Sequence, residues 1–145
     1  MGRTRFSTWM LIIGLFAIGV LAVAPATPAM AAHTAKITIH KAVCDSNVQD
    51  IFGKCHDNRL KGVWFRVAGV WRQTNSNGEV SWGPGAGTKT IVEDSATFNK
   101  YGAAYVFCSN QVTGRVLFDG LRTVNWVTIQ TTAGQPVICD WYNLT

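Results

Sequence analysis

Short runs in which apolar and polar residues alternate cover most of the chain after residue 36, and this pattern constrains the fold most. In 37–41 (ITIHK), 63–68 (VWFRVA) and 123–131 (TVNWVTIQT) every second side chain falls on one face, as in a strand that is buried on one side. Turn residues such as 83–87 (GPGAG) separate the runs, and no segment shows a sustained helical period. About seven or eight short strands at this spacing predict an all-β fold, a single antiparallel β-sandwich.

The alternation and the turn residues together give the positions of the individual strands. The expected strands are 37–41, 63–68, 79–82, 88–93, 104–108, 115–118, 123–131 and 137–143. The stretch 75–78 (NSNG) carries a strong hairpin signal, and 43–59 reads as a polar connection without a helix.

The first 31 residues are predicted to be a secretory signal peptide. Arg3 and Arg5 precede an uncharged apolar run at 9–24, and helix-breaking prolines and small residues follow up to Ala31, as in an exported precursor. The alternative is an uncleaved membrane anchor, but the run is shorter than the about 20 residues that a membrane helix needs. We therefore expect cleavage near Ala31 and a secreted β-sandwich domain at 32–145, with no membrane segment after cleavage.

All four cysteines lie in the predicted mature domain, and an even number in an exported domain indicates disulfides. A zinc site built from Cys44, Cys55 and His56 is the alternative, but it lacks a close C-x-x-C pair. Four cysteines allow three pairings. We favour Cys44–Cys55, which closes a local polar loop, and Cys108–Cys139, which joins two strand-like segments.

Charge and motifs argue against several classes of function. The 13 basic and 8 acidic residues among 145 are scattered along the chain. This excess of positive charge is too small and too dispersed to indicate a nucleic-acid-binding protein. No G-x-S-x-G motif occurs, and no carboxylate spacing suggests a glycosidase pair. We therefore expect no turnover enzyme, no cofactor, no metal and no nucleic-acid partner.

Three strands each carry one polar residue on a face whose other residues are apolar. Lys41 shares its face with Ile37 and Ile39, Glu93 lies two residues after an isoleucine, and Asn143 shares its face with Trp141. A buried charge is costly unless it is paired, so the lysine, the carboxylate and the amide are candidates to meet inside the sandwich. The alternative is that all three lie at strand ends and are solvated.

Several segments resemble the collagen-adhesin (Cna) B-type domains of bacterial surface and secreted proteins, also called SpaA-like prealbumin-fold domains. The likeness lies in 37–41 (ITIHK), 60–67 (LKGVWFRV), 74–80 (TNSNGEV), 87–93 (GTKTIVE) and 139–143 (CDWYN). The resemblance implies an immunoglobulin-like or prealbumin-like sandwich that serves as a structural or adhesive module at a cell surface.

The same resemblance implies a self-processing reaction. The lysine of the first strand, Lys41, would attack the side-chain amide of Asn143 in the last strand and release ammonia, with Glu93 as the proton shuttle. The stretch 93–102 (EDSATFNKYG) lacks the proline that is usual in the family, so Asp94 is a rival for the acid. Two disulfides could also replace such a covalent link.

A second hypothesis is an extracellular module that binds carbohydrate or cell wall through exposed aromatic side chains. The candidates in the mature domain are Trp64, Trp71, Trp82, Trp126, Trp141, Tyr101, Tyr105 and Tyr142. The alternative is that these rings fill the core. A cell-surface or extracellular protein or glycan is the expected kind of partner under either hypothesis.

Overall fold

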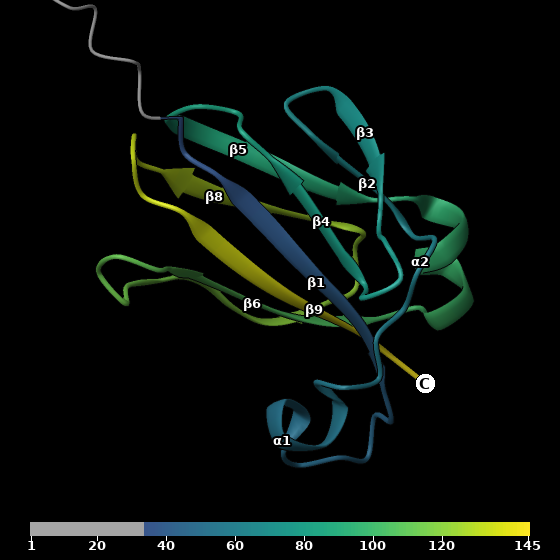
Figure 1. The fold of residues 1–145 in the computed structure, drawn as a ribbon. Helices are drawn as coiled ribbons and strands as arrows, with labels where there is room; N and C mark the ends of the chain where they lie inside the picture. The colour runs from purple at the N-terminus through teal and green to yellow at the C-terminus, as the bar shows by residue number, and fades with distance from the viewer. Residues whose placement is uncertain (1–33) are drawn as a thin grey trace, which may run out of the picture.

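Nine strands form two facing sheets in a computed structural model that describes residues 34–145 (Figure 1). The predicted signal peptide and its cleavage site lie outside the described residues. The strands are β1 (Ile37–Cys44), β2 (Trp64–Val67), β3 (Val70–Gln73), β4 (Glu79–Trp82), β5 (Gly87–Glu93), β6 (Ala104–Asn110), β7 (Val116–Arg122), β8 (Trp126–Thr131) and β9 (Val137–Leu144). The all-β sandwich expected from the sequence is confirmed, with nine strands in place of seven or eight.

The five-stranded sheet has the order β4-β1-β9-β6-β7, and the four-stranded sheet has the order β3-β2-β5-β8. One pairing departs from the antiparallel expectation, because β1 and β9 run parallel through the centre of the five-stranded sheet. The other neighbouring pairs are antiparallel. The parallel pair places the first and last strands side by side with their inward faces in step.

The extra strand, β3, arises from a tight hairpin. Ala68 and Gly69 both have positive φ, 49° and 82°, and a two-residue turn of this kind joins twisted antiparallel strands well. The expected Asn-Gly hairpin is wrong in one respect. Gly78 N–H does donate to the carbonyl of Asn75 at 3.0 Å, but β3 and β4 belong to different sheets, so the turn carries the chain from one sheet to the other.

Two short helices lie at the margins of the sandwich, in segments where the sequence predicted none. α1 (Ile51–Cys55) lies in the connection after β1, and Asp50 caps its first turn by accepting from the Gly53 N–H at 2.9 Å. α2 (Ser95–Tyr101) follows β5 and is capped by Asp94. Both helices are too short to produce a clear helical period in the sequence.

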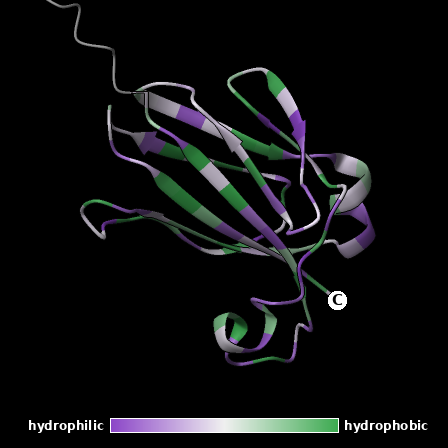
Figure 2. Cartoon of the chain, viewed as in Figure 1, coloured by the Kyte–Doolittle hydropathy of each residue, from purple (hydrophilic) through white to green (hydrophobic). Residues whose placement is uncertain are grey.

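The core is built from the inward faces of both sheets. Figure 2 shows green apolar segments alternating with polar ones along β1 and β9. Buried residues of the main cluster come from every strand except β3 and β7, and include Ile37, Phe65, Ile91, Val106 and Trp141. A smaller cluster lies under α1 on the other face of the five-stranded sheet, around Tyr142 and Ala42.

Two disulfides tie the elements together. Cys44 at the end of β1 is joined to Cys55 in α1, and Cys108 of β6 is joined to Cys139, its cross-strand partner in β9. Because Cys44 and Cys55 bond to each other, the zinc site considered for them with His56 is not formed. Within residues 34–145 no group of three or more metal-binding side chains gathers, and no helix there has the length and apolarity to cross a membrane.

Candidate functional site

Lys41, Glu93 and Asn143 come together between the two sheets. Lys41 lies on β1 and Asn143 on β9 of the five-stranded sheet, whereas Glu93 ends β5 of the four-stranded sheet. Each of the three residues is 0% exposed, so the alternative of solvated strand ends does not describe them. β9 also supplies Trp141, which is in register with Lys41 on the parallel neighbour.

One oxygen of Glu93 contacts both the amine and the amide. Lys41 Nζ lies 3.1 Å from Glu93 Oε1, and Asn143 Nδ2 donates to the same oxygen at 2.8 Å. The carboxyl group therefore holds the two side chains on either side of a single atom. Lys41 is in register with Trp141, and Asn143 lies two residues further along β9 on the same inward face, so Lys41 and Asn143 are diagonal neighbours on the two parallel strands.

The second oxygen of Glu93 is held by a residue that sequence analysis did not assign to this site. Trp141 Nε1 donates to Glu93 Oε2 at 2.9 Å. The Trp141 ring also packs edge-on against Phe65, with 5.2 Å between ring centroids, and Phe65 is the cross-strand partner of Glu93. The sequence feature that could have assigned Trp141 to the site is its position two residues before Asn143, which places both side chains on the same inward face.

Two polar atoms of the site are buried without a hydrogen-bond partner, Lys41 Nζ and Asn143 Oδ1. Lys41 Nζ is within ion-pair distance of Glu93, but it does not make a well-directed hydrogen bond. Buried polar groups without partners are rare and costly. The site is therefore polar and fully buried, and its hydrogen-bonding capacity is incompletely used.

Burial shifts both titrating groups toward their neutral forms. Desolvation lowers the pKa of Lys41 from 10.5 to about 8, although the nearby Glu93 acts in the opposite direction. Desolvation also raises the pKa of Glu93, against the opposing effects of Lys41, Asn143 and Trp141. Burial in the site therefore favours the uncharged amine of Lys41 and the uncharged carboxylic acid of Glu93 over their charged forms.

The backbone of Lys41 is held by the turn before β4 and by the connection before β2. Its N–H donates to the carbonyl of Gly78 at 2.7 Å, and its own carbonyl accepts from Leu60 N–H at 2.9 Å. Gly78 has φ +70°, and a Cβ there would lie 2.6 Å from the Lys41 carbonyl oxygen. A residue larger than glycine does not fit beside Lys41 without a backbone shift.

Asp94, the rival for the acid, has a different role in the structure. Its Oδ1 accepts from Thr97 N–H at 2.9 Å and caps α2. Its charge helps to hold the pKa of Lys41 up, but the group in contact with Lys41 and Asn143 is Glu93.

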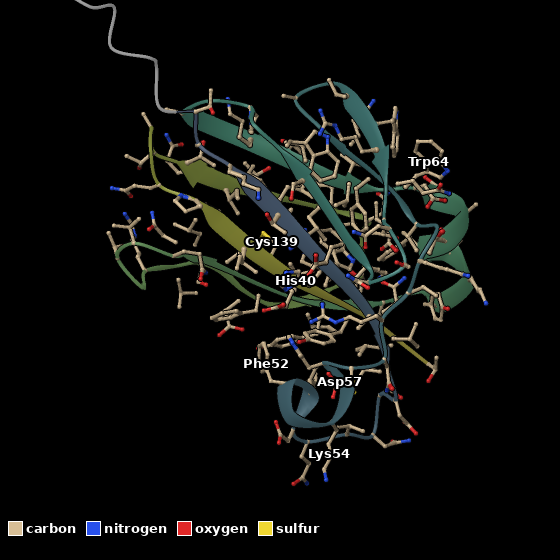
Figure 3. The ribbon with its side chains drawn as sticks, viewed as in Figure 1. His40, Phe52, Lys54, Asp57, Trp64 and Cys139 are labelled. Carbon is tan, nitrogen blue, oxygen red and sulfur yellow. A yellow bond between two sulfur atoms is a disulfide. The ribbon has the colours of Figure 1, made fainter. Side chains whose placement is uncertain are left out.

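The aromatic residues divide into buried and exposed sets. Trp82, Trp141 and Tyr142 are buried, and Tyr101 and Tyr105 are partly exposed. Trp64, Trp71 and Trp126 are 46%, 44% and 45% exposed. All three lie on the four-stranded sheet, and Trp64 projects to the periphery of the molecule near α2 (Figure 3).

Comparison with known proteins finds similarity among solved structures but none among family models or curated proteins. No protein-family model matches the chain, and no curated protein matches it. Among solved structures it is similar to the major pilin from Streptococcus pyogenes, with a TM-score of 0.40 and 13% identity. A single-residue mutant of that pilin gives a TM-score of 0.44 and 11% identity. Each match covers 78% of this chain and 48% of the pilin chain, so the chain spans about half the length of the pilin.

Proposed function

We propose that this chain is an extracellular, non-catalytic structural or adhesive β-sandwich module that links Lys41 to Asn143 by an isopeptide bond. The observation that carries the proposal is the fully buried contact of one Glu93 oxygen with both the Lys41 amine and the Asn143 amide. A buried lysine adds little to the stability of a core, because its charge must be desolvated. A hydrophobic side chain of similar volume would fill the same space without that cost.

The reaction exchanges one amide for another. The neutral amine of Lys41 attacks Cγ of Asn143 and forms a new C–N bond, the bond from Cγ to Nδ2 breaks, and ammonia leaves. The attack needs an unprotonated amine, and the lowered pKa of Lys41 supplies one. The folded core holds the reactants together and so replaces a bimolecular encounter.

Glu93 acts as the acid and the proton carrier in this proposal. A half-turn of the Asn143 amide exchanges Nδ2 and Oδ1, and the carbonyl oxygen then accepts a hydrogen bond from protonated Glu93. That bond polarises the carbonyl and stabilises the oxyanion of the tetrahedral intermediate. Glu93 then donates its proton to Nδ2, which leaves as ammonia, and takes a proton from the Lys41 nitrogen, so that Glu93 is protonated again at the end.

The position of the link explains its structural value. Residues 41 and 143 lie on neighbouring strands near opposite ends of the described chain, so the bond would enclose nearly all of the sandwich. Tension applied at the two ends would then pass through the bond and leave the enclosed strands unstretched.

The disulfides support the extracellular part of the proposal. Two disulfides, with no free cysteine in the described region, fit an oxidising compartment. The predicted signal peptide points the same way.

The intact mass of the purified protein tests this function. We expect the wild-type protein to be lighter than its sequence by one ammonia after the disulfides are counted, and Glu93→Gln to show no such loss. Circular dichroism of the variant checks that it is folded. A folded wild-type protein without the deficit would overturn the proposed bond.

A further inference from the structure

The outer face of the four-stranded sheet carries one row of side chains that crosses all four strands. Trp71 of β3 is in register with Arg66 of β2, Arg66 with Val92 of β5, and Val92 with Trp126 of β8. The row therefore has an aromatic ring at each end and a guanidinium and an apolar side chain between them. With about 4.8 Å between strands, the two tryptophans stand about 14 Å apart.

This row lines an open groove of about 680 Å³. Trp71 and Trp126 are nearly half exposed although they border it. Its polar lining includes Thr90 and Thr128, whose hydroxyls lie 3.2 Å apart across β5 and β8. Asn125 also lines the groove and is held in place, since its Nδ2 donates to the Glu93 carbonyl at 2.7 Å.

The groove is positively charged. The Arg66 guanidinium lies 5.3 Å from the Trp71 ring centre, and that of Arg122 lies 5.5 Å from the Trp126 ring centre. No carboxylate lines the groove, and the ion pairs found within residues 34–145 involve neither arginine. The exposed Arg66, which lines the groove, is thus available to an anionic ligand, and Arg122 adds positive charge beside it.

We propose that this groove binds an acidic glycan, a chain of pyranose rings that carry carboxylates. Sugar rings would stack on Trp71 and Trp126, a carboxylate would pair with Arg66, and ring hydroxyls would exchange hydrogen bonds with Thr90 and Thr128. This inference goes beyond the structural role and is independent of the Lys41–Asn143 bond, which lies on the other side of the sheet.

The composition of the groove favours a glycan over a nucleic acid. Affinity for nucleic acid comes largely from many lysine and arginine contacts to phosphates, and Arg66 is the one basic residue among those that line this groove. Aromatic rings together with fixed hydroxyl and amide groups instead suit a ligand that is itself rich in hydroxyls. An oligonucleotide is therefore the competing ligand in the test.

Tryptophan fluorescence and isothermal titration calorimetry with the full chain test the proposal. The probes are oligomers of galacturonic acid, the same oligomers with their carboxylates methyl-esterified, and a single-stranded oligonucleotide. The variants are Trp126→Ala and Arg66→Gln. The matched control is Trp64→Ala, which removes an equally exposed tryptophan from the same sheet but outside the groove.

We expect the acidic oligomer to bind more tightly than its methyl ester. Trp126→Ala should weaken both, whereas Arg66→Gln should weaken only the acidic form, by about tenfold or more for a lost charged hydrogen bond. Trp64→Ala should bind as wild type does. The proposal is overturned if the acidic oligomer does not bind, if Trp64→Ala loses as much affinity as Trp126→Ala, or if the oligonucleotide binds more tightly than the acidic oligomer.

Discussion

Lys41 Nζ and Glu93 Oε1 lie 3.1 Å apart across the interface of the two sheets, and neither side chain reaches solvent. An ion pair in such a place is expensive because both charges leave water. The same burial brings the amine and the carboxylic acid toward their neutral forms, which is the state that amide exchange needs. The contact therefore makes better sense as a reactive arrangement than as a stabilising salt bridge.

The rate at which the Lys41–Asn143 bond forms should depend on pH. The pKa of Lys41 is lowered to about 8, so below that value each unit of pH increases the fraction of neutral amine, and hence the rate of bond formation, about tenfold. The rate should stop rising above about pH 8, and should fall where Glu93 loses its proton. To measure the rate, protein that was folded at about pH 5 is moved to a series of higher pH values. Mass spectrometry then follows the loss of ammonia with time at each pH. A rate that does not change with pH would contradict the assigned roles.

The second prediction concerns the hydrogen bond from Trp141 to Glu93. Trp141→Phe keeps an aromatic ring against Phe65 but removes the donor at 2.9 Å, which should cost about 1–3 kcal/mol of stability and slow bond formation. Trp82→Phe is the control, because its Nε1 donates to the Val70 carbonyl at the same distance. It should lose similar stability in chemical denaturation and form the bond at the wild-type rate. Equal slowing in both variants would show that Trp141 has only a packing role.

The third prediction concerns Gly78. Gly78→Ala combines a positive φ with a contact of 2.6 Å to the Lys41 carbonyl, so it should destabilise the fold by more than about 1 kcal/mol and slow the reaction. Gly114 has nearly the same φ, +69°, but open space around its Cβ position. Gly114→Ala should therefore show the conformational cost alone and leave the rate of bond formation unchanged. Denaturation and ammonia-loss curves of the two variants decide this, and a Gly114→Ala protein that reacts as slowly as Gly78→Ala would exclude a positioning role.

The fourth prediction separates the two disulfides. The Cys108–Cys139 loop spans 31 residues and the Cys44–Cys55 loop spans 11. Replacing each pair by alanine should cost about 4 and about 3 kcal/mol, respectively, on chain-entropy grounds. Loss of Cys44–Cys55 should also increase hydrogen exchange in α1 without affecting the sandwich strands. Loss of protection throughout both sheets in that variant would show that α1 is part of the cooperative core.

Sequence alternation was sufficient to assign the fold class and to place Lys41, Glu93 and Asn143 on inward faces, because the period of a strand is two. It could not show that β1 and β9 pair in parallel, since strand pairing between distant segments leaves no local signal. β3 was missed because all four of its residues are exposed, which removes the contrast between its faces. The role of Trp141 depends on a contact with the opposite sheet, and that contact is not encoded in spacing along one strand.

A covalent bond between Lys41 and Asn143 can be detected by tandem mass spectrometry of proteolytic peptides. We expect a branched peptide that joins the segment around Lys41 to the segment around Asn143, lighter by one ammonia than the sum of the two. We also expect that trypsin does not cleave after Lys41 and that the branched peptide is absent from Glu93→Gln. Recovery of the two segments as separate, full-mass peptides from the folded wild-type protein would show that the bond does not form.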